Sequence, residues 1–367
     1  MTVSSAEPNT QLAESSDKNL CPDDDFGATS RRHRVLLALA PLALLLIVVV
    51  ALSIGRLTVP FVEVVRMLAG QVFPIGQTWT AQEENVVLGS RLPRVVLSMI
   101  VGGGLALGGA ALQAVFRNPL VSPQVIGVSS GASFGGVLAL LFGLASVWLV
   151  GLAFAGGLLA IGIVLLIASG GRGGSILMVV LGGIVVSALF SALVSLVTYV
   201  ADPYTTLPSI VFWLMGSLAA ADPTKVLIAL VPIAVGAALI LGLRWQINVL
   251  SLGDDDASSL GINARRLRAV LLVTVAFMTA GAVAVAGVIG WVGLVVPHIS
   301  RLLVGPDHRV HLPMTILLGA GYLAVIDTLS RTVIAAELPV GILTAVIGAP
   351  VFILLLRAAR RGRELDG

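Results

Sequence analysis

Long apolar stretches, divided by short polar or glycine-containing breaks, make up most of the chain after residue 34. A transmembrane helix needs roughly 20 predominantly apolar residues, and no run of short alternating segments suggests a membrane β-barrel. The pattern therefore predicts an all-α, polytopic membrane protein with about ten spans. We place the spans at 35–55, 95–116, 125–145, 147–168, 176–200, 226–243, 269–287, 288–304, 314–334 and 340–357.

Two of the apolar stretches are too long for a single helix. The segment from Val125 to Ser169 carries no charged residue, and we place its turn near Gly143 to Ser146. Residues 269–304 also hold two helices, with a break near Gly287 to Gly290.

Composition supports the membrane assignment. Of the 367 residues, 57% are hydrophobic and 11% are charged, and the mean hydropathy is +1.04. Residues 1–30 are polar, acidic and without periodicity, which predicts a disordered tail before a transmembrane domain over 31–367. The single cysteine, Cys21, lies in this tail, so disulfides play no part. The net charge of +3 is small and the arginines are scattered at span ends, which argues against nucleic-acid binding.

Lysine and arginine are distributed unequally between the two sides of the predicted spans. If the N-terminus is inside, the outer side holds only Arg56, Arg66, Arg91, Arg94, Lys225 and Arg331, and the other basic residues lie inside. Because cytoplasmic loops carry an excess of lysine and arginine, both termini are predicted to be cytoplasmic.

Two patterns concern how the spans pack. RLPRVV (91–96) opens the second span from outside and RLRAVL (266–271) opens the seventh from inside, which suggests an inverted repeat. The 41 glycines cluster within spans, as in 101–113, 127–136 and 280–290. Small residues allow close helix packing in lipid, and sliding of these helices in a transport cycle is the alternative explanation.

The most polar internal stretch is SLGDDDASSLGINARRLR, residues 251–268, within a loop of about 245–268. Asp254 is a good N-cap for a short helix, and Asp255 and Asp256 suit the positive end of its dipole. Gly253 would form a hinge before this helix, and Gly261 fits the left-handed position after its end. Leu252, Ala257 and Leu260 supply apolar points. A solvated connector would need neither a capped helix nor paired glycines, so the stretch predicts a contact with a cytoplasmic partner.

SLGDDDASSLG resembles the cytoplasmic coupling loop in permease subunits of iron-siderophore, haem and vitamin B12 ABC importers, the FecCD-like family. Four further segments look like signatures of that family, in its order: RLPRVVLSMIVGGGLALGGAALQAVFRNPLVSPQVIGVSSGA (91–132), FWLMGSLA (212–219), VGLVVPHISRLLVGPDHRVHLP (292–313) and ELPVGILTAVIGAPVFILLLR (337–357). The resemblance covers nearly the whole chain from the first span onward and leaves out the tail before Arg31.

The resemblance implies a ten-helix importer permease in the cytoplasmic membrane of a bacterium, carrying a ferric siderophore, haem or cobalamin. It also implies a second permease subunit, identical or paralogous, two ATPase subunits and an extracytoplasmic substrate-binding protein. The loop from Leu252 to Gly261 would lie in a groove of the ATPase. The chain contains no Walker lysine motif, so a partner would use ATP and magnesium, and this chain would bind no cofactor and act as no enzyme.

Several other polar residues have two explanations each. In the resembled family, arginines matching Arg91, Arg94 and Arg331 pair with glutamates of the binding protein, whereas outer arginines in general anchor to lipid headgroups. Asp327, the only carboxylate within a span, would be the coupling residue if the chain were an ion-coupled secondary transporter. Arg331 lies one turn later, so a local ion pair is the simpler explanation. A membrane receptor is a third class, and His298, His308 and His311 lack the acidic or cysteine neighbours of a metal site.

Overall fold

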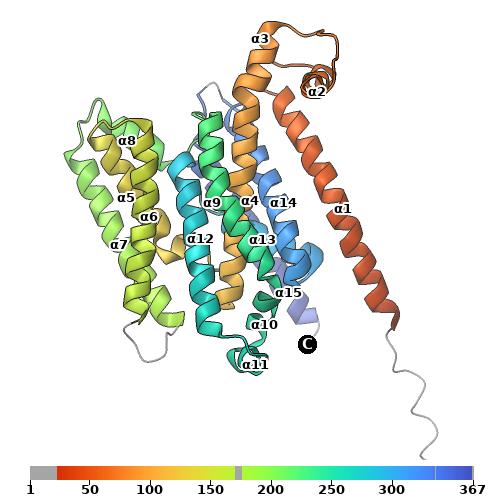
Figure 1. Ribbon diagram of the computed structural model, residues 1–367, viewed down its shortest axis with the longest axis vertical. Helices are drawn as coiled ribbons and strands as arrows, with labels where there is room; N and C mark the ends of the chain where they lie inside the picture. Colours follow the sequence, from red (N-terminus) through yellow and green to blue (C-terminus); the bar gives the residue numbers. More distant parts are fainter. Residues whose placement is uncertain (1–22, 170–175, 335, 366–367) are drawn as a thin grey trace, which may run out of the picture.

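The computed structural model describes residues 23–169, 176–334 and 336–365, and within these ranges it is helical, without strands (Figure 1). The α-helices are α1 (Asp23–Ser53), α2 (Phe61–Gly70), α3 (Ala81–Glu84), α4 (Leu92–Phe116), α5 (Val128–Leu141), α6 (Ser146–Ser169), α7 (Ile176–Val200), α8 (Thr206–Leu214), α9 (Pro223–Gly242), α10 (Arg244–Leu252), α11 (Asp254–Ser259), α12 (Ala264–Ala286), α13 (Val292–Val304), α14 (His308–Ser330) and α15 (Val340–Leu365). A π-helical turn, η1 (Asn85–Arg91), joins α3 to α4, and a 3-10 turn, η2 (Pro123–Ile126), precedes α5.

The membrane spans follow the sequence pattern. Among the described residues, 7 helices are long and apolar enough to cross a membrane, and they include α1, α4, α6, α7, α9, α12 and α14. Three shorter apolar helices, α5, α13 and Val340–Leu355 of α15, complete the order of the predicted spans. The predicted turn occurs at Gly143, where φ is +61°, and the second break separates α12 from α13. The prediction of an all-α, polytopic membrane protein is confirmed.

Two helices begin earlier than predicted. Helix α1 starts at Asp23, so residues 23–30 are helical rather than part of a disordered tail, and residues 1–22 of that tail lie outside the described residues. The segment begins with DDDFG, and acidic residues are favourable at the positive, N-terminal end of a helix dipole. The second span begins at Ala81 because Thr80 and Glu83 form a capping box, and α3, η1 and α4 then continue to Phe116.

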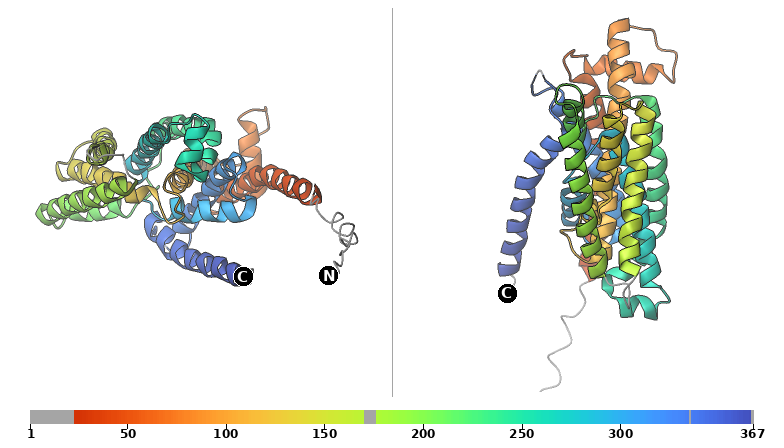
Figure 2. Two further views of the ribbon diagram at one scale, coloured as in Figure 1. Left: turned by 90° about the horizontal axis from the view of Figure 1, so that it is seen from below. Right: turned by 90° about the vertical axis from the view of Figure 1, so that its left-hand side faces the viewer.

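Helices α4 and α12 form the centre of the bundle. In their most apolar windows 83% and 78% of the residues are buried, compared with 17% for α1. Helix α4 packs against α9, α12, α13 and α14, while α5 packs against α6 and α7. Figure 2 shows α1 and α15 at the edge of the bundle.

Glycines permit the closest of these contacts. A Cβ at Gly102 would overlap the backbone carbonyl of Gly319 on α14, and a Cβ at Gly109 would overlap Gly293 on α13. Gly131 of α5 meets Gly156 of α6 in the same way. At these positions the glycines serve close helix packing, as the composition of the spans suggested.

The two ends of the bundle differ. Helices α10 and α11 lie at one end together with the start of α1 and the end of α15, while α2, α3 and α8 lie at the opposite end (Figure 1). Helices α4 and α12 run in opposite directions, as entry from opposite sides of the membrane requires. The inverted repeat itself stays a prediction.

Candidate functional site

The polar stretch forms an elbow, which we define as α10, Gly253 and α11 together with the turn to Gly261. Helix α10 ends at Leu252, and Gly253 has extended angles of φ 166° and ψ 166°. Any residue can adopt an extended backbone, so these torsion angles do not require a glycine at the predicted hinge. Gly261 has a φ of +75° after the end of α11, which is the left-handed conformation predicted for it. The predicted short helix and its terminal glycine are both present.

Asp254 connects the elbow to the centre of the bundle. It is the first residue of α11 and not the predicted N-cap, because Gly253 occupies that position. Its carboxylate accepts hydrogen bonds from Arg117 at 2.5 Å and from Arg268 at 2.8 Å. The hydrogen bond from Arg268 and the charges of both arginines hold the pKa of Asp254 below its ordinary value, although burial acts in the opposite direction. Arg117 Nε also donates to the carbonyl of Leu250 at 3.1 Å, so the end of α4 is tied to both helices of the elbow.

The outer surface of the elbow is partly apolar and partly acidic. Leu252 and Leu260 are 71% and 56% exposed, and Asp255 and Asp256 are also exposed. Ala257, which the sequence suggested as part of the contact surface, is instead fully buried. It lies one turn after Asp254 on the side of α11 that the arginines hold against the bundle. The exposed leucines and aspartates remain as the candidate contact surface.

A recess of about 210 Å³ opens beside the elbow. It is lined by Gln113, Ala114, Arg117, Asn118, Pro119, Ser251, Arg301, Pro306 and His308. Nε of Arg301 is buried, and the described part of the chain offers Arg301 neither a hydrogen bond nor an ion pair. Nδ1 of the 3% exposed His308 also lacks a partner there. A partly buried guanidinium without a counterion creates a site that favours an anionic group.

The three histidines do not act together. His308 donates its backbone N–H to Asn248 Oδ1 at 2.8 Å, and its ring lies 5.5 Å from that of His311. His311 Nε2 donates to the carbonyl of Pro297 at 2.9 Å. His298 has its ring centroid 6.1 Å from that of Phe352, and no group of three or more His, Cys, Asp or Glu among the described residues could hold a metal ion.

A second charged group, the outer cluster, lies near the opposite end of the bundle and consists of Arg91, Arg94, Asp327, Arg331 and Glu337. Arg94 Nε donates to both oxygens of Asp327, at 2.8 and 3.1 Å, and its Nη1 donates to Glu337 at 2.9 Å. The predicted pair between Asp327 and Arg331 is longer, at 3.8 Å. Arg94, which is distant in sequence, is therefore the main partner of Asp327.

Arg91 and Arg331 bind the backbone at the end of α1. Arg91 donates to the carbonyls of Leu52 at 2.6 Å and Ser53 at 3.2 Å, and Arg331 donates to Ile54 at 2.8 Å. Arg331 also donates to the carbonyl of Ala51. The last carbonyls of a helix have no partner within it, and cations are favourable near them, so the two arginines cap α1.

The burial of these arginines limits what they present to a partner. Arg91, Arg94 and Arg331 are 6%, 8% and 7% exposed. Their charged groups bind carbonyls and carboxylates of this chain, and docking on a binding protein stays a prediction. The structure gives them an internal role, which joins α1, α4 and α14.

Three residues of these sites were not singled out from the sequence. Arg117 and Arg301 contributed to the charge asymmetry and, like Glu337, lay within segments that resemble the family, but none of the three was given a role of its own. Arg117 meets Asp254 across 137 positions, a separation that leaves no local signal. Glu337 offered a weak one, since it is a lone carboxylate just before the last span.

Comparison with known proteins places these sites in a family. The model of the FecCD transport family matches residues 43–358. The molybdate import system permease protein of Haemophilus influenzae is 41% identical over 88% of this chain and 95% of its own length. The ferric enterobactin transport system permease protein of Escherichia coli is 37% identical over 89% of this chain and 96% of its own. A solved structure of a metal-chelate type ABC transporter in an inward-facing conformation is 40% identical, with a TM-score of 0.80 over 89% of this chain and 99% of that one.

The match extends from the first span to the last and includes the elbow and the outer cluster. In this family the membrane-spanning subunit translocates the substrate, and a separate chain hydrolyses ATP. The chain belongs to the FecCD transport family and is a permease subunit of an ATP-binding cassette importer.

Proposed function

We propose that the elbow is the surface on which an ATPase subunit docks and through which its movement reaches the membrane helices. The supporting observation is the combination of exposed Leu252 and Leu260 with the ion pairs of Asp254 to Arg117 and Arg268. The leucines offer apolar area to a partner, and the ion pairs connect the same segment to α4 and α12. A force on α11 would therefore act directly on the two most buried spans.

The recess next to the elbow would receive an acidic side chain of the same partner. Arg301 lacks a counterion among the described residues, and Arg117 and Ser251 line both the recess and the base of the elbow. A carboxylate placed there would pair with a partly desolvated guanidinium, an interaction stronger than a solvent-exposed ion pair.

The remaining partners follow from the same arrangement. The elbow and both described ends of the chain lie on one side of the bundle. We propose that this side faces the cytoplasm of a bacterium, and the excess of lysine and arginine supports the cytoplasmic orientation. The extracytoplasmic binding protein would then meet the end formed by α2, α3 and α8. A second permease subunit, identical or paralogous, would complete the pathway, and the ATPase subunits would use ATP and magnesium.

The ion-coupled alternative loses its basis in this structure. Asp327 is fully buried, and both of its oxygens accept hydrogen bonds from Arg94. A carboxylate that binds and releases a coupling ion needs access to water, which this ion pair does not provide.

For the cargo we propose a bulky metal chelate, of the ferric siderophore, haem or cobalamin kind. The relatives include ferric enterobactin, hemin and cobalamin permeases, and the solved neighbour is of the metal-chelate type. Cells that lack this chain should lose uptake of a radiolabelled iron chelate and keep that of molybdate. If molybdate uptake were lost and chelate uptake stayed normal, the cargo would be molybdate, as the name of the Haemophilus relative states for that protein.

The docking proposal is tested by co-purification of the ATPase subunit. Replacing Leu252 and Leu260 together by glutamate should abolish co-purification, whereas replacing both by methionine should preserve it, because methionine keeps the apolar area. Arg301→Gln should weaken the complex, with Arg66→Gln, an exposed arginine of α2 at the opposite end of the bundle, as the control. Normal assembly of the double glutamate variant would exclude the elbow as the docking surface.

A further inference from the structure

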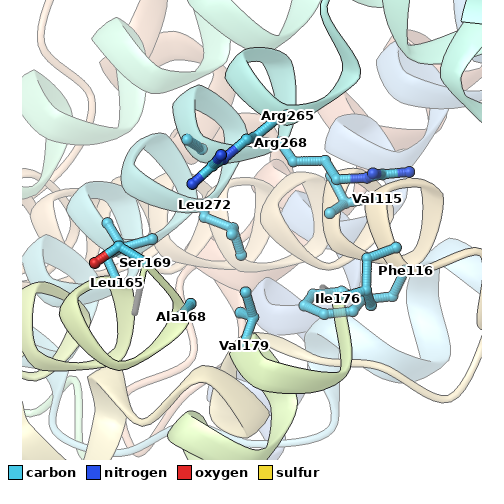
Figure 3. Close-up of a pocket in the computed structure, with 11 residues that line it drawn as sticks. Val115, Phe116, Leu165, Ala168, Ser169, Ile176, Val179, Arg265, Arg268 and Leu272 are labelled. Atoms are coloured by element: carbon cyan, nitrogen blue, oxygen red, sulfur yellow. The ribbon is translucent and has the colours of Figure 1, made fainter. Parts of the chain in front are cut away.

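A cavity of about 230 Å³, here called the inner cavity, lies between α4, α6, α7 and α12. Its walls are almost entirely apolar, and they include Val115, Phe116, Leu165, Ile176, Val179 and Leu272. Figure 3 shows Arg265 and Arg268 along one side of the cavity, facing Leu165, Ala168 and Val179. The cavity therefore has an apolar interior and a basic edge.

The two arginines leave donor groups unused. The structure gives the side chain of Arg265, which is exposed, no hydrogen bond or ion pair within the described ranges. The side chain of Arg268 is only 12% exposed, and its terminal nitrogens bind Asp254. Its Nε is buried and has no partner among the described residues. Among the described residues, the edge of the cavity thus carries one cation without a partner and one further N–H donor, and both favour an anion.

The position of the cavity identifies the kind of anion. Phe116 and Ser169 end α4 and α6, Ile176 begins α7, and Arg265 is the second residue of α12. The cavity lies where the apolar spans meet the elbow, at the level of the lipid headgroups on that side of the membrane. Basic pockets between transmembrane helices on the cytoplasmic side bind the headgroups of anionic lipids.

We propose that the inner cavity binds an anionic phospholipid, with its phosphate at Arg265 and Arg268 and part of one acyl chain among the apolar walls. A free phosphate ion would leave those walls unused, whereas a phospholipid satisfies both parts of the cavity. The proposal rests on the membrane orientation given above but not on docking of the ATPase.

The lipid would also influence the elbow through Arg268. That arginine holds Asp254 at the start of α11, and its guanidinium would be shared between the carboxylate and the lipid phosphate. Occupancy of the inner cavity would then fix the position of Arg268 and, with it, the tie between α12 and α11.

The test is native mass spectrometry of the purified full-length chain, reconstituted with phosphatidylglycerol or phosphatidylcholine. Wild-type protein should retain phosphatidylglycerol preferentially. Arg265→Gln should lower that retention about fivefold, the effect expected for one basic residue near a phosphate. Ala269→Trp, at an exposed position that lines the cavity, should lower retention by filling the space for the acyl chain.

Arg266→Gln is the matched control. The substitution removes the same charge, and Arg266 is an exposed neighbour on α12 that does not line the cavity. It should retain wild-type binding. Equal losses of phosphatidylglycerol retention in Arg265→Gln and Arg266→Gln would mean that only the net charge of the protein matters, and would overturn the proposal. Unchanged retention in Ala269→Trp would also overturn it. Displacement of the lipid by millimolar inorganic phosphate would also overturn it, because the site would then be an anion site without a role for the acyl chain. The ATPase is absent from this measurement, so its outcome is independent of the docking proposal.

Discussion

Asp254 of the elbow and Arg117 at the end of α4 form an ion pair of 2.5 Å across 137 positions of sequence. Arg117 has a φ of +48°, an uncommon conformation for a residue with a side chain, and in this conformation it ends the most buried span. The pair joins the elbow, our proposed docking surface for an ATPase, to the centre of the membrane domain. Its loss should affect coupling more than folding.

We expect Asp254→Asn to loosen the elbow while the chain remains inserted and folded. The carboxylate is 52% exposed, so each of its ion pairs contributes only about 0.2–1 kcal/mol and the melting temperature should change little. Hydrogen exchange at residues 253–261 should accelerate. Asp255→Asn removes the same charge from an exposed neighbour and should leave exchange unchanged. Equal exchange in the two variants would show that the ion pairs do not hold α11.

The same tie should depend on pH in a defined direction. The pKa of Asp254 is lowered in the folded state, so its stabilising effect is complete above the ordinary pKa of an aspartate and is lost as the pH falls through the lowered value. A fluorine label on a cysteine at Ser258 would report the change by NMR in acid. The transition should be absent in Asp254→Asn, and a transition that persists there would assign it to another group.

Gly261→Val should weaken assembly with the ATPase without preventing insertion. The φ of Gly261 is +75°, which costs a residue with a Cβ roughly 1–2 kcal/mol and a β-branched one more. Apart from its chain neighbours, no described residue places an atom within 4 Å of a Cβ at this position, so the effect comes from the backbone and not from a clash. Gly261→Asn is the control, because asparagine tolerates the left-handed conformation. Equal co-purification of ATPase with the valine and asparagine variants would contradict the interpretation.

In the outer cluster, breaking the pair between Arg94 and Asp327 should destabilise the fold. Asp327→Leu leaves Arg94 buried without its main partner, a change that costs about 3–5 kcal/mol. The double variant Arg94→Met/Asp327→Leu should be more stable than the single one, because the buried charge of Arg94 is removed together with its partner, while Glu337, which also loses Arg94, is 32% exposed. Thermal unfolding in detergent measures both. Arg66→Met, which removes the exposed pair with Glu63, should change stability by less than about 1 kcal/mol.

The orientation can be tested with single cysteines in a chain whose Cys21 is replaced by serine. A cysteine at Ser258, exposed on the elbow, should be protected from an impermeant thiol reagent in intact cells. A cysteine at Gln77, exposed near α3 at the opposite end, should react. The reverse result would place the elbow outside and remove the basis for ATPase docking.

Most structural features that depend on residues close together in the chain could be predicted from the sequence. The span order follows from hydropathy, and the left-handed turn at Gly261 follows from the local pattern of polar residues and glycines. The roles of the outer arginines could not be predicted, because the choice between a partner and an internal acceptor depends on where α1 ends in space. The same limit applies to Ala257, whose burial depends on ion pairs from two other helices.

The caps on α1 also bear on the order in which the protein is assembled. Helix α1 is synthesised before α14. The carbonyls at its end are nevertheless bound by Arg91 and by Arg331, and Arg331 follows Ala51 by 280 positions. Until the ribosome has delivered α14 to the membrane, part of that end has no internal donor for its carbonyls and depends on water or a chaperone. The first helix to enter the bilayer is therefore among the last to be completed, and a chain that stops before Arg331 would be open to quality-control proteolysis at its N-terminal span.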